Sequence, residues 1–429
     1  MGVPLKKVAV IGGGLAGLSA ASRLAEAGLA ATLFEAAPQL GGRARTVHYQ
    51  GHILDNGQHI LLGAYHQTLD LMASVGLDQH SALLRLPLAL NMHGCFNLKA
   101  KRLPAPLHLL FGLLAAQGLR WHERLAAIRF FIYLNIKRFK LASDQSVLSL
   151  LEQQHQPARL IKWLWEPLCL AAMNTPIQSA SAQTFINVLR DSFNQSKSDS
   201  DLLLPKLDLS ALLADPIAQH IKQRGGEIKL NTSVDEIEQS SCGFNLKLVG
   251  GQSMAFSHVI IATSPALTKA ISHQLAIAKD LAELSYQPIY TVYLQYPSHV
   301  KLKNVMTGFT QGLAQWAFDR GQLTGQHGLI AVIISAQGAH QTYSQQALAE
   351  AISQELKQAF ADLPAPLWHK VIAEKRATFA CEAGMKRPAQ KTNTPNLYLA
   401  GDYTDGDYPA TIEGAIASGV SAAQLVIQS

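Results

Sequence analysis

Residues 7–17 read KVAVIGGGLAG, and this stretch decides the fold. A short apolar run typical of a buried strand leads into a turn that fits G-x-G-x-x-G. Gly12 permits the tight turn, Gly14 lets the backbone approach a diphosphate, and Gly17 allows close helix–strand packing. Residues 15–26 carry apolar side chains at helical spacing, so the free N–H groups of this predicted helix face the phosphates. The sequence therefore predicts a strand–turn–helix unit that binds a dinucleotide.

A second predicted strand, residues 31–35, ends in Glu35. In a dinucleotide-binding unit, an acid at this position accepts hydrogen bonds from the adenosine ribose hydroxyls. A carboxylate there repels a 2′-phosphate, so the sequence disfavours NADP at this site. No second G-x-G-x-x-G occurs in the chain, and we therefore expect an external electron donor.

Composition limits the class of protein. The 429 residues are 48% hydrophobic and 15% charged, which suits two or three domains with a large buried core. The four cysteines lie far apart without a CxxC pair, so we expect no metal site and no disulfide framework. The longest apolar run, residues 103–119, is broken by prolines and polar residues, which disfavours a membrane-spanning helix. The first strand follows without a signal-peptide pattern, so we expect a cytoplasmic protein.

Positive charge is concentrated in residues 99–141, which contain nine lysines and arginines but only one acid. Apolar residues recur there at helical spacing, namely Trp121, Leu125, Ile128, Ile132, Ile136 and Phe139. Two interpretations stay open. The helix can lie on the anionic inner face of the cell membrane as a peripheral contact, or it can pack as a cap with a solvated basic face. Dense apolar residues among the charges argue against nucleic acid as a partner.

Two further motifs resemble the flavoprotein superfamily that contains amine oxidases, protoporphyrinogen oxidases and carotenoid desaturases. The first is LGGRART, residues 40–46, in which Arg43 can offer a planar fork to the FAD pyrophosphate. The second is NLYLAGD, residues 396–402, where the resemblance implies that Asp402 binds the ribityl chain. Residues 410–416 look like the start of a last helix whose free N–H groups face the flavin. The resemblance thus implies FAD as the cofactor.

Other segments complete the expected cofactor site. Residues 259–265 resemble the returning strand of that superfamily, and residues 225–234 bring the backbone near the adenine. The predicted cofactor contacts are Gly12, Gly14, Leu15, Ala16, Gly17, Glu35, Gly42, Arg43, Gly57, Gln58, Val234, Gly401, Asp402, Thr411 and Ile412.

The motifs predict an α/β fold whose Rossmann-type FAD-binding domain is formed from both chain ends. We expect this domain to comprise residues 1–84, 206–268 and 388–429. Residues 85–205 should form a mostly helical cap that includes the membrane-contact candidate. Residues 269–387 should form a substrate-binding domain with a mixed sheet.

Four more specific segments resemble the hydroxysqualene dehydroxylases, also called squalene-associated FAD-dependent desaturases. They are DNGQH at residues 55–59, WEPLCLAAMNT at 165–175, DLLLP at 201–205 and GDYT at 401–404, and the resemblance extends over nearly the whole chain. It implies reduction of hydroxysqualene to squalene in hopanoid biosynthesis, with loss of water and hydride transfer from flavin N5. A long apolar isoprenoid substrate of this kind requires an apolar channel.

Loss of the hydroxyl group needs an acid. His59 is one candidate, because an unperturbed imidazole pKa suits proton donation near neutrality. Glu166 is another, because burial among apolar residues can keep a carboxyl protonated. Both residues can equally be structural, and Asp55 and Asn174 are weaker candidates.

Two other functions remain open. An oxidative, carotenoid-type desaturase on the same fold differs chiefly in the direction of electron flow. A non-catalytic prenyl-lipid carrier shares the fold but lacks an intact flavin site. An amine substrate is disfavoured, since amine oxidases usually place an aromatic residue where this chain has Thr411.

Overall fold

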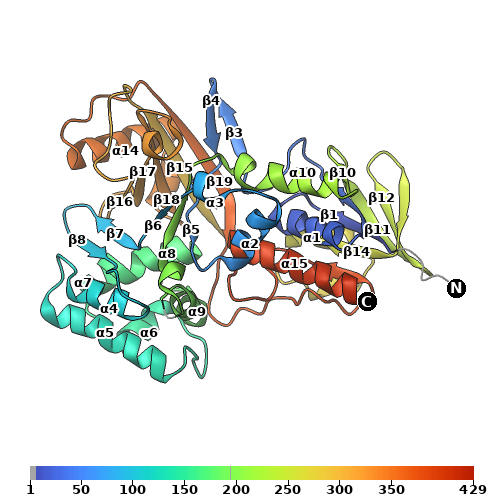
Figure 1. Cartoon of the computed structure of the whole chain (residues 1–429), viewed down its shortest axis with the longest axis horizontal. Helices are drawn as coiled ribbons and strands as arrows, with labels where there is room; N and C mark the ends of the chain where they lie inside the picture. Colours follow the sequence, from blue (N-terminus) through green and yellow to red (C-terminus); the bar gives the residue numbers. More distant parts are fainter. Residues whose placement is uncertain (1–5, 194) are drawn as a thin grey trace.

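A five-stranded parallel sheet joins the two ends of the chain (Figure 1). The computed structural model describes residues 6–193 and 195–429, so residues 1–5 and 194 of the predicted regions lie outside the described part. The strand order is β10-β2-β1-β14-β20, and every adjacent pair is parallel. The strands are β1 (Lys7–Ile11), β2 (Ala30–Phe34), β10 (Glu227–Lys229), β14 (His258–Ile261) and β20 (Leu397–Leu399). They come from three separated segments, as the motifs predict.

Two helices from opposite chain ends pack together beside this sheet. They are α1 (Leu15–Glu26) and α15 (Ile412–Gln428), and α10 (Asp215–Gln223) also packs on α1. The α1 and α15 backbones approach so closely that a Cβ at Gly419 would lie 2.1 Å from the Ala16 carbonyl oxygen. Helix α1 begins at Leu15, as predicted, because the glycine turn precedes it. Helix α15 begins at Ile412, within the predicted start at residues 410–416, because Thr411 caps it.

A second, seven-stranded sheet has the order β19-β15-β18-β17-β16-β7-β8. It is mixed, because β16 and β7 are parallel whereas the other pairs are antiparallel. Its strands are β7 (Ala89–Met92), β8 (Phe96–Lys99), β15 (Tyr286–Gln295), β16 (Met306–Gly308), β17 (Trp316–Asp319), β18 (Leu329–Ser335) and β19 (Trp368–Phe379). Helix α14 (Gln345–Ala359) packs against β15 and β19.

The start of the expected helical cap is not helical. Residues 89–99 form β7 and β8 instead, and extend the mixed sheet. In β8, buried Phe96 and Leu98 alternate with exposed Asn97 and Lys99, which is the period of a strand with one buried face.

The remainder of residues 100–193 is mostly helical, as expected. The helices are α4 (Leu107–Leu114), α5 (Trp121–Ile136), α6 (Val147–Gln153), α7 (Ala158–Leu160), α8 (Glu166–Met173) and α9 (Ala182–Phe193). A π-helical turn, Ile161–Trp165, leads into α8. Fully buried Trp165 makes edge-on contacts with Phe130 of α5 and Phe185 of α9, so it holds these helices together.

Smaller elements connect these parts. They are β3 (Thr46–Tyr49), β4 (His52–Asp55), β5 (Leu61–Leu62), β6 (Leu83–Leu86), β9 (Leu202–Pro205), β11 (Val234–Ser240), β12 (Gly243–Leu248), β13 (Ser253–Phe256), α2 (His66–Ser74), α3 (Gln79–Ala82), α11 (Pro265–Ile271), α12 (Ile277–Asp280) and α13 (Arg320–Thr324). The exact domain boundaries stay a prediction.

The glycine turn yields a stability prediction. A Cβ at Gly17 would lie 1.9 Å from the Gly12 carbonyl oxygen, whereas one at Gly14 would meet no atom of the described residues within 4 Å. We therefore expect Gly17→Ala to lower the free energy of unfolding of the cofactor-free chain by on the order of 2–3 kcal/mol. Gly14→Ala should change it by less than about 1 kcal/mol. Denaturant unfolding measures both, and equal stability of the two variants would contradict the close packing at Gly17.

Candidate active site

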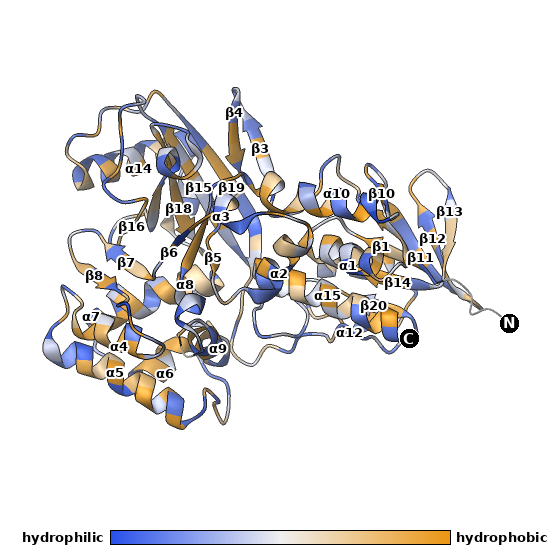
Figure 2. Ribbon diagram, in the orientation of Figure 1, coloured by the Kyte–Doolittle hydropathy of each residue, from blue (hydrophilic) through white to orange (hydrophobic). Residues whose placement is uncertain are grey.

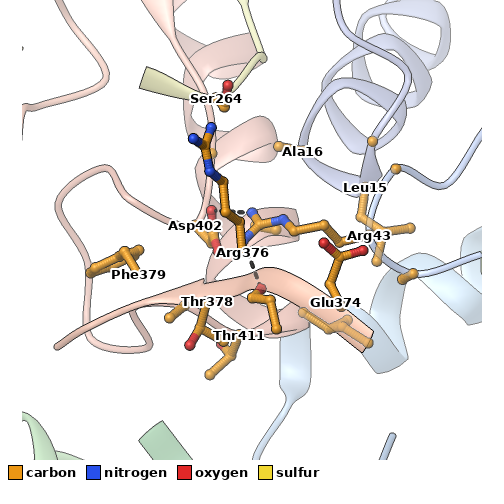
Figure 3. A pocket seen from close by; sticks show the side chains of 18 of the residues that line it. Leu15, Ala16, Arg43, Ser264, Glu374, Arg376, Thr378, Phe379, Asp402 and Thr411 are labelled. Atoms are coloured by element: carbon orange, nitrogen blue, oxygen red, sulfur yellow. Dashed lines mark hydrogen bonds and ion pairs between the residues drawn. The ribbon is translucent and has the colours of Figure 1, made fainter. Parts of the chain in front are cut away.

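A cavity of about 570 Å³ lies between the two sheets. From the five-stranded sheet it is lined by the glycine turn, and from the mixed sheet by apolar and charged side chains (Figure 3). Its apolar lining includes Ile60, Met173, Ile289, Trp316, Phe318 and Ile333. The cavity therefore offers exposed backbone on one side and an apolar surface on the other.

The Gly-Gly segment is joined to the glycine turn by backbone contacts. Gly41 donates its N–H to the Gly13 carbonyl at 2.9 Å, and Gly42 lies so close that its Cβ would sit 3.2 Å from the Gly14 Cα. Positive φ angles of 99° at Gly41 and 59° at Gly42 permit this approach. Gly12, Gly14, Leu15, Ala16 and Gly42 line the cavity, whereas Gly17 packs behind it.

Glu35 holds the glycine turn from the side. Its Oε2 accepts a hydrogen bond from the Gly13 N–H at 2.6 Å, and its Oε1 accepts one from Ala37 at 2.7 Å. Glu35 and Val234 both line the cavity. Their predicted contacts with the adenosine stay predictions, and the carboxylate is already fixed in place at the end of β2.

Arg43 and Asp402 form an ion pair in the cavity wall (Figure 3). The Arg43 Nη2 lies 2.7 Å from Asp402 Oδ1, and Nη1 donates to the Ala377 carbonyl at 2.9 Å. The charge of Asp402 raises the pKa of Arg43, so the guanidinium stays charged. Because its fork is engaged by these two partners, the predicted pyrophosphate contact of Arg43 stays a prediction.

The N-terminus of α15 opens on the cavity. Thr411 caps the helix, with its Oγ1 accepting a hydrogen bond from the Gly414 N–H at 3.0 Å. Thr411, Ile412 and Gly401 line the cavity, as predicted for flavin contacts. A helix N-terminus carries partial positive charge, so this end of the cavity favours a group that gains negative charge.

The segment at residues 55–59 is divided between wall and core. Gly57, Gln58 and His59 line the cavity. Asp55 does not; its buried carboxylate pairs with Arg320 at 3.2 Å and accepts a hydrogen bond from Leu209 N–H at 2.8 Å. The geometry thus removes Asp55 from the reacting groups, because these partners hold it in the core.

The surroundings of His59 do not favour its predicted role as an acid. Burial, and then the positive charge of Arg43, lower the pKa of His59 to about 4. The imidazole is therefore neutral near pH 7. It lacks the acidic second proton that an unperturbed pKa would have supplied.

Glu166 and Asn174 lie at opposite ends of α8. Burial raises the pKa of Glu166, as expected, but its side chain does not line the cavity. Asn174 lines the cavity, yet its amide is engaged: Nδ2 donates to Thr378 Oγ1 at 2.9 Å, and Oδ1 accepts from Ala336 N–H at 2.7 Å. Asn174 thus fixes the end of α8 against the mixed sheet.

Three ionisable cavity residues of the mixed sheet were not predicted from the sequence. They are Tyr286 at the start of β15 and Glu374 and Arg376 on β19. Charged residues two positions apart in a strand share a face, so the EKRATF stretch at residues 374–379 carried the signal. Nothing in the chain alone indicated that this face lines the cavity.

These features define a class of protein: a dinucleotide-binding oxidoreductase with a cofactor cradle built from both chain ends and a separate apolar compartment. The family model for flavin containing amine oxidoreductase matches residues 15–427, and the chain belongs to this family. It is an FAD-dependent oxidoreductase. The glycine turn with open space at Gly14, the Gly41–Gly42 contact and the α15 N-terminus fit this cofactor.

Two curated relatives match almost the whole chain. A hydroxysqualene dehydroxylase of Rhodopseudomonas palustris is 27% identical over 436 residues, covering 98% of each protein. A 15-cis-phytoene desaturase of Arabidopsis thaliana is 26% identical over 461 residues, covering 98% of this chain and 80% of the relative.

Solved structures share the fold. Cyclohexylamine oxidase from Brevibacterium oxydans superimposes with a TM-score of 0.72 at 17% identity, with 99% of both chains covered. An oxidoreductase from Methanosarcina mazei reaches a TM-score of 0.75 at 16% identity, covering 97% of this chain and all of its own. At these identities the likeness concerns the fold alone.

The lowered pKa of His59 predicts a pH effect on stability. Between pH 6.5 and 4, the unfolded chain takes up a proton at this residue that the folded chain resists. The free energy of unfolding should therefore fall as the pH drops through this window, and His59→Gln should reduce that fall. Denaturant unfolding of the cofactor-free proteins at pH 7 and pH 5 measures the difference. The same pH dependence in both proteins would contradict a neutral, buried imidazole.

Proposed function

We propose that this enzyme carries out the FAD-dependent reductive dehydroxylation of hydroxysqualene to squalene. The observation that carries the proposal is the apolar half of the cavity, which continues directly from the cofactor cradle. A C30 hydrocarbon chain presents almost no polar groups, so such a surface binds it by the hydrophobic effect. The chain matches two hydroxysqualene dehydroxylases over 98% of their length, and this similarity supports hydroxysqualene as the substrate.

Different residues of the chain would hold different parts of the cofactor. The turn at Gly12–Ala16 would receive the pyrophosphate, Glu35 and Val234 the adenosine, and Asp402 the ribityl chain. Backbone at Gly42, Gly57, Gln58 and Gly401, together with the N-terminus of α15, would hold the flavin. When bound and reduced, FAD supplies the hydride that replaces the hydroxyl group. The apolar wall excludes water from the reacting carbon.

The direct test is anaerobic. The flavin of the purified holoenzyme is reduced chemically, hydroxysqualene is added, and flavin absorbance is followed together with product analysis. We expect reoxidation with one squalene formed per flavin, because hydride leaves the flavin as the hydroxyl leaves the substrate. Reduced flavin that persists in the presence of hydroxysqualene would contradict the proposal.

A carotenoid-type desaturase is the second candidate, and the phytoene desaturases among the relatives favour it. Electron flow is then reversed, so the oxidised enzyme should be bleached by a more saturated polyene. A prenyl-lipid carrier would bind such a chain without any change in flavin absorbance.

We also propose that α4 and α5 rest on an anionic membrane surface, from which the isoprenoid enters. None of the helices formed by residues 6–193 and 195–429 is long and apolar enough to cross a membrane. Six of the twelve exposed large apolar side chains of the described residues lie on these two helices: Leu107, Phe111, Trp121, Leu125, Ile132 and Ile136. We call them the apolar face; Figure 2 shows apolar residues along both helices among hydrophilic ones.

Helix α5 is apolar on opposite sides. Its inner side buries Ala126, Ala127, Phe130 and Leu134, while Ile132 and Ile136 of the apolar face are 53% and 74% exposed. Phe139, expected to continue the outer stripe, is instead buried in the turn after the helix. An outer apolar side surrounded by exposed Arg120, Arg129, Lys137, Arg138 and Lys140 has the composition of an interfacial helix.

Vesicle binding tests this contact. Arg124 donates to the carbonyls of Leu114 and Leu119 and is left unchanged, since it joins α5 to α4. Replacing Arg129 and Lys137 by Glu should weaken binding to phosphatidylserine-containing vesicles about tenfold or more, since each basic residue contributes about 1 kcal/mol near such a surface. Leu367 is an apolar residue that is 68% exposed and lies far from α5 in the sequence. Leu367→Ser is therefore the control for non-specific hydrophobic adsorption to vesicles. Undiminished co-sedimentation of the charge-reversed variant would favour a packed cap.

A further inference from the structure

We propose that Glu374 is the proton donor to the departing hydroxyl group, a role that rests on the proposed dehydroxylation. Three carboxyl groups line the cavity: Glu35, Glu374 and Asp402. Both oxygens of Glu35 accept backbone hydrogen bonds, and Asp402 is paired with Arg43. Within the part of the chain that the structure describes, the Glu374 carboxyl makes neither a side-chain hydrogen bond nor an ion pair, so no protein group holds it away from a substrate.

The position of Glu374 suits this task. It lies on β19 directly opposite Ile289 of β15, which belongs to the apolar lining. On its other side lies Arg43, which Figure 3 shows beside the Glu374 carboxyl group. Glu374 therefore stands at the boundary between the apolar compartment and the cofactor cradle, where the reacting carbon must lie.

The other candidate acids are less suited by their geometry. Asp55 is held in the core by Arg320, and Glu166 does not line the cavity. His59 faces the cavity but is neutral. Besides His59 and Glu374, the cavity lining contains these titratable side chains: Glu35, Arg43, Tyr65, Tyr286, Arg376, Asp402 and Tyr403.

The proton balance closes with this assignment. As the allylic C–O bond breaks, its electron pair stays on oxygen, which takes the proton of Glu374 and leaves as water. The carbon receives the hydride supplied by reduced FAD, so one C–H bond replaces one C–O bond. The Glu374 carboxylate that results faces the positive charges of Arg43 and Arg376. It regains a proton from solvent, since Arg376 beside it is exposed.

The experiment compares Glu374→Gln with the wild-type holoenzyme in single-turnover reoxidation of reduced flavin by hydroxysqualene. Glutamine keeps the shape of the side chain but cannot donate an acidic proton, so we expect the rate to fall on the order of 100-fold or more. Glu374→Asp should retain an intermediate rate. Lys375→Gln is the matched control, because this exposed neighbour on the same strand does not line the cavity and should react at the wild-type rate.

Two binding measurements separate proton donation from a structural role. FAD affinity is measured by flavin fluorescence, and squalene binding to the oxidised holoenzyme by quenching of Trp316, which lines the apolar compartment. Both should be unchanged in Glu374→Gln.

Each outcome is decisive. A Glu374→Gln rate within about threefold of wild type overturns the assignment, and so does a slow rate that is fully explained by lost FAD or squalene binding. Wild-type protein whose reduced flavin is inert toward hydroxysqualene overturns the proposed function itself, and the assignment with it. The two failures are distinguishable because the second is visible without any variant.

Discussion

The ion pair between Arg43 and Asp402 is the contact on which the architecture of the site depends. It joins residues 359 positions apart, and the same guanidinium reaches the Ala377 carbonyl of the mixed sheet. One side chain thereby connects the Gly-Gly segment, the end of β20 and β19. The Asp402 side chain is only 8% exposed, whereas the Arg43 side chain is 45% exposed, so water still reaches the guanidinium. The pair therefore acts mainly by holding three segments in register, because solvent screens the attraction between its charges.

Backbone proximity is the second constraint. The glycine turn, the Gly-Gly segment and the α1–α15 contact all bring main chain against main chain at distances that a Cβ would prevent. Such contacts leave backbone N–H groups and helix N-termini facing open space instead of side chains, and phosphates bind to surfaces of this kind. Gly12, Gly41 and Gly42 therefore serve both the packing of the fold and the lining of the cavity.

The mixed sheet supplies the other wall of the cavity. Its strands present an apolar surface, interrupted on β19 by Glu374 and Arg376, to the space opposite the glycine turn. At the far side of the cap, α5 uses one apolar side for its own core and leaves another open. Both features suit an apolar substrate that reaches the enzyme from a lipid surface, and neither is needed for FAD binding.

The sequence by itself determined the glycine turn, the first and last helices, the parallel sheet from both chain ends and the FAD cofactor, because these follow from local spacing and from motifs with one physical use. Of the predicted cofactor contacts, all but Gly17 line the cavity, since Gly17 serves packing; their contacts with FAD stay a prediction. Only the tertiary structure decided the protonation state and the partners of the ionisable residues. His59 is neutral because burial, and after it the charge of Arg43, lower its pKa; Asp55 is structural because Arg320 meets it; and the Glu374 carboxyl has no side-chain partner within the described residues. Protonation and reactivity depend on neighbours distant in the chain, and no local pattern records which neighbours folding will supply.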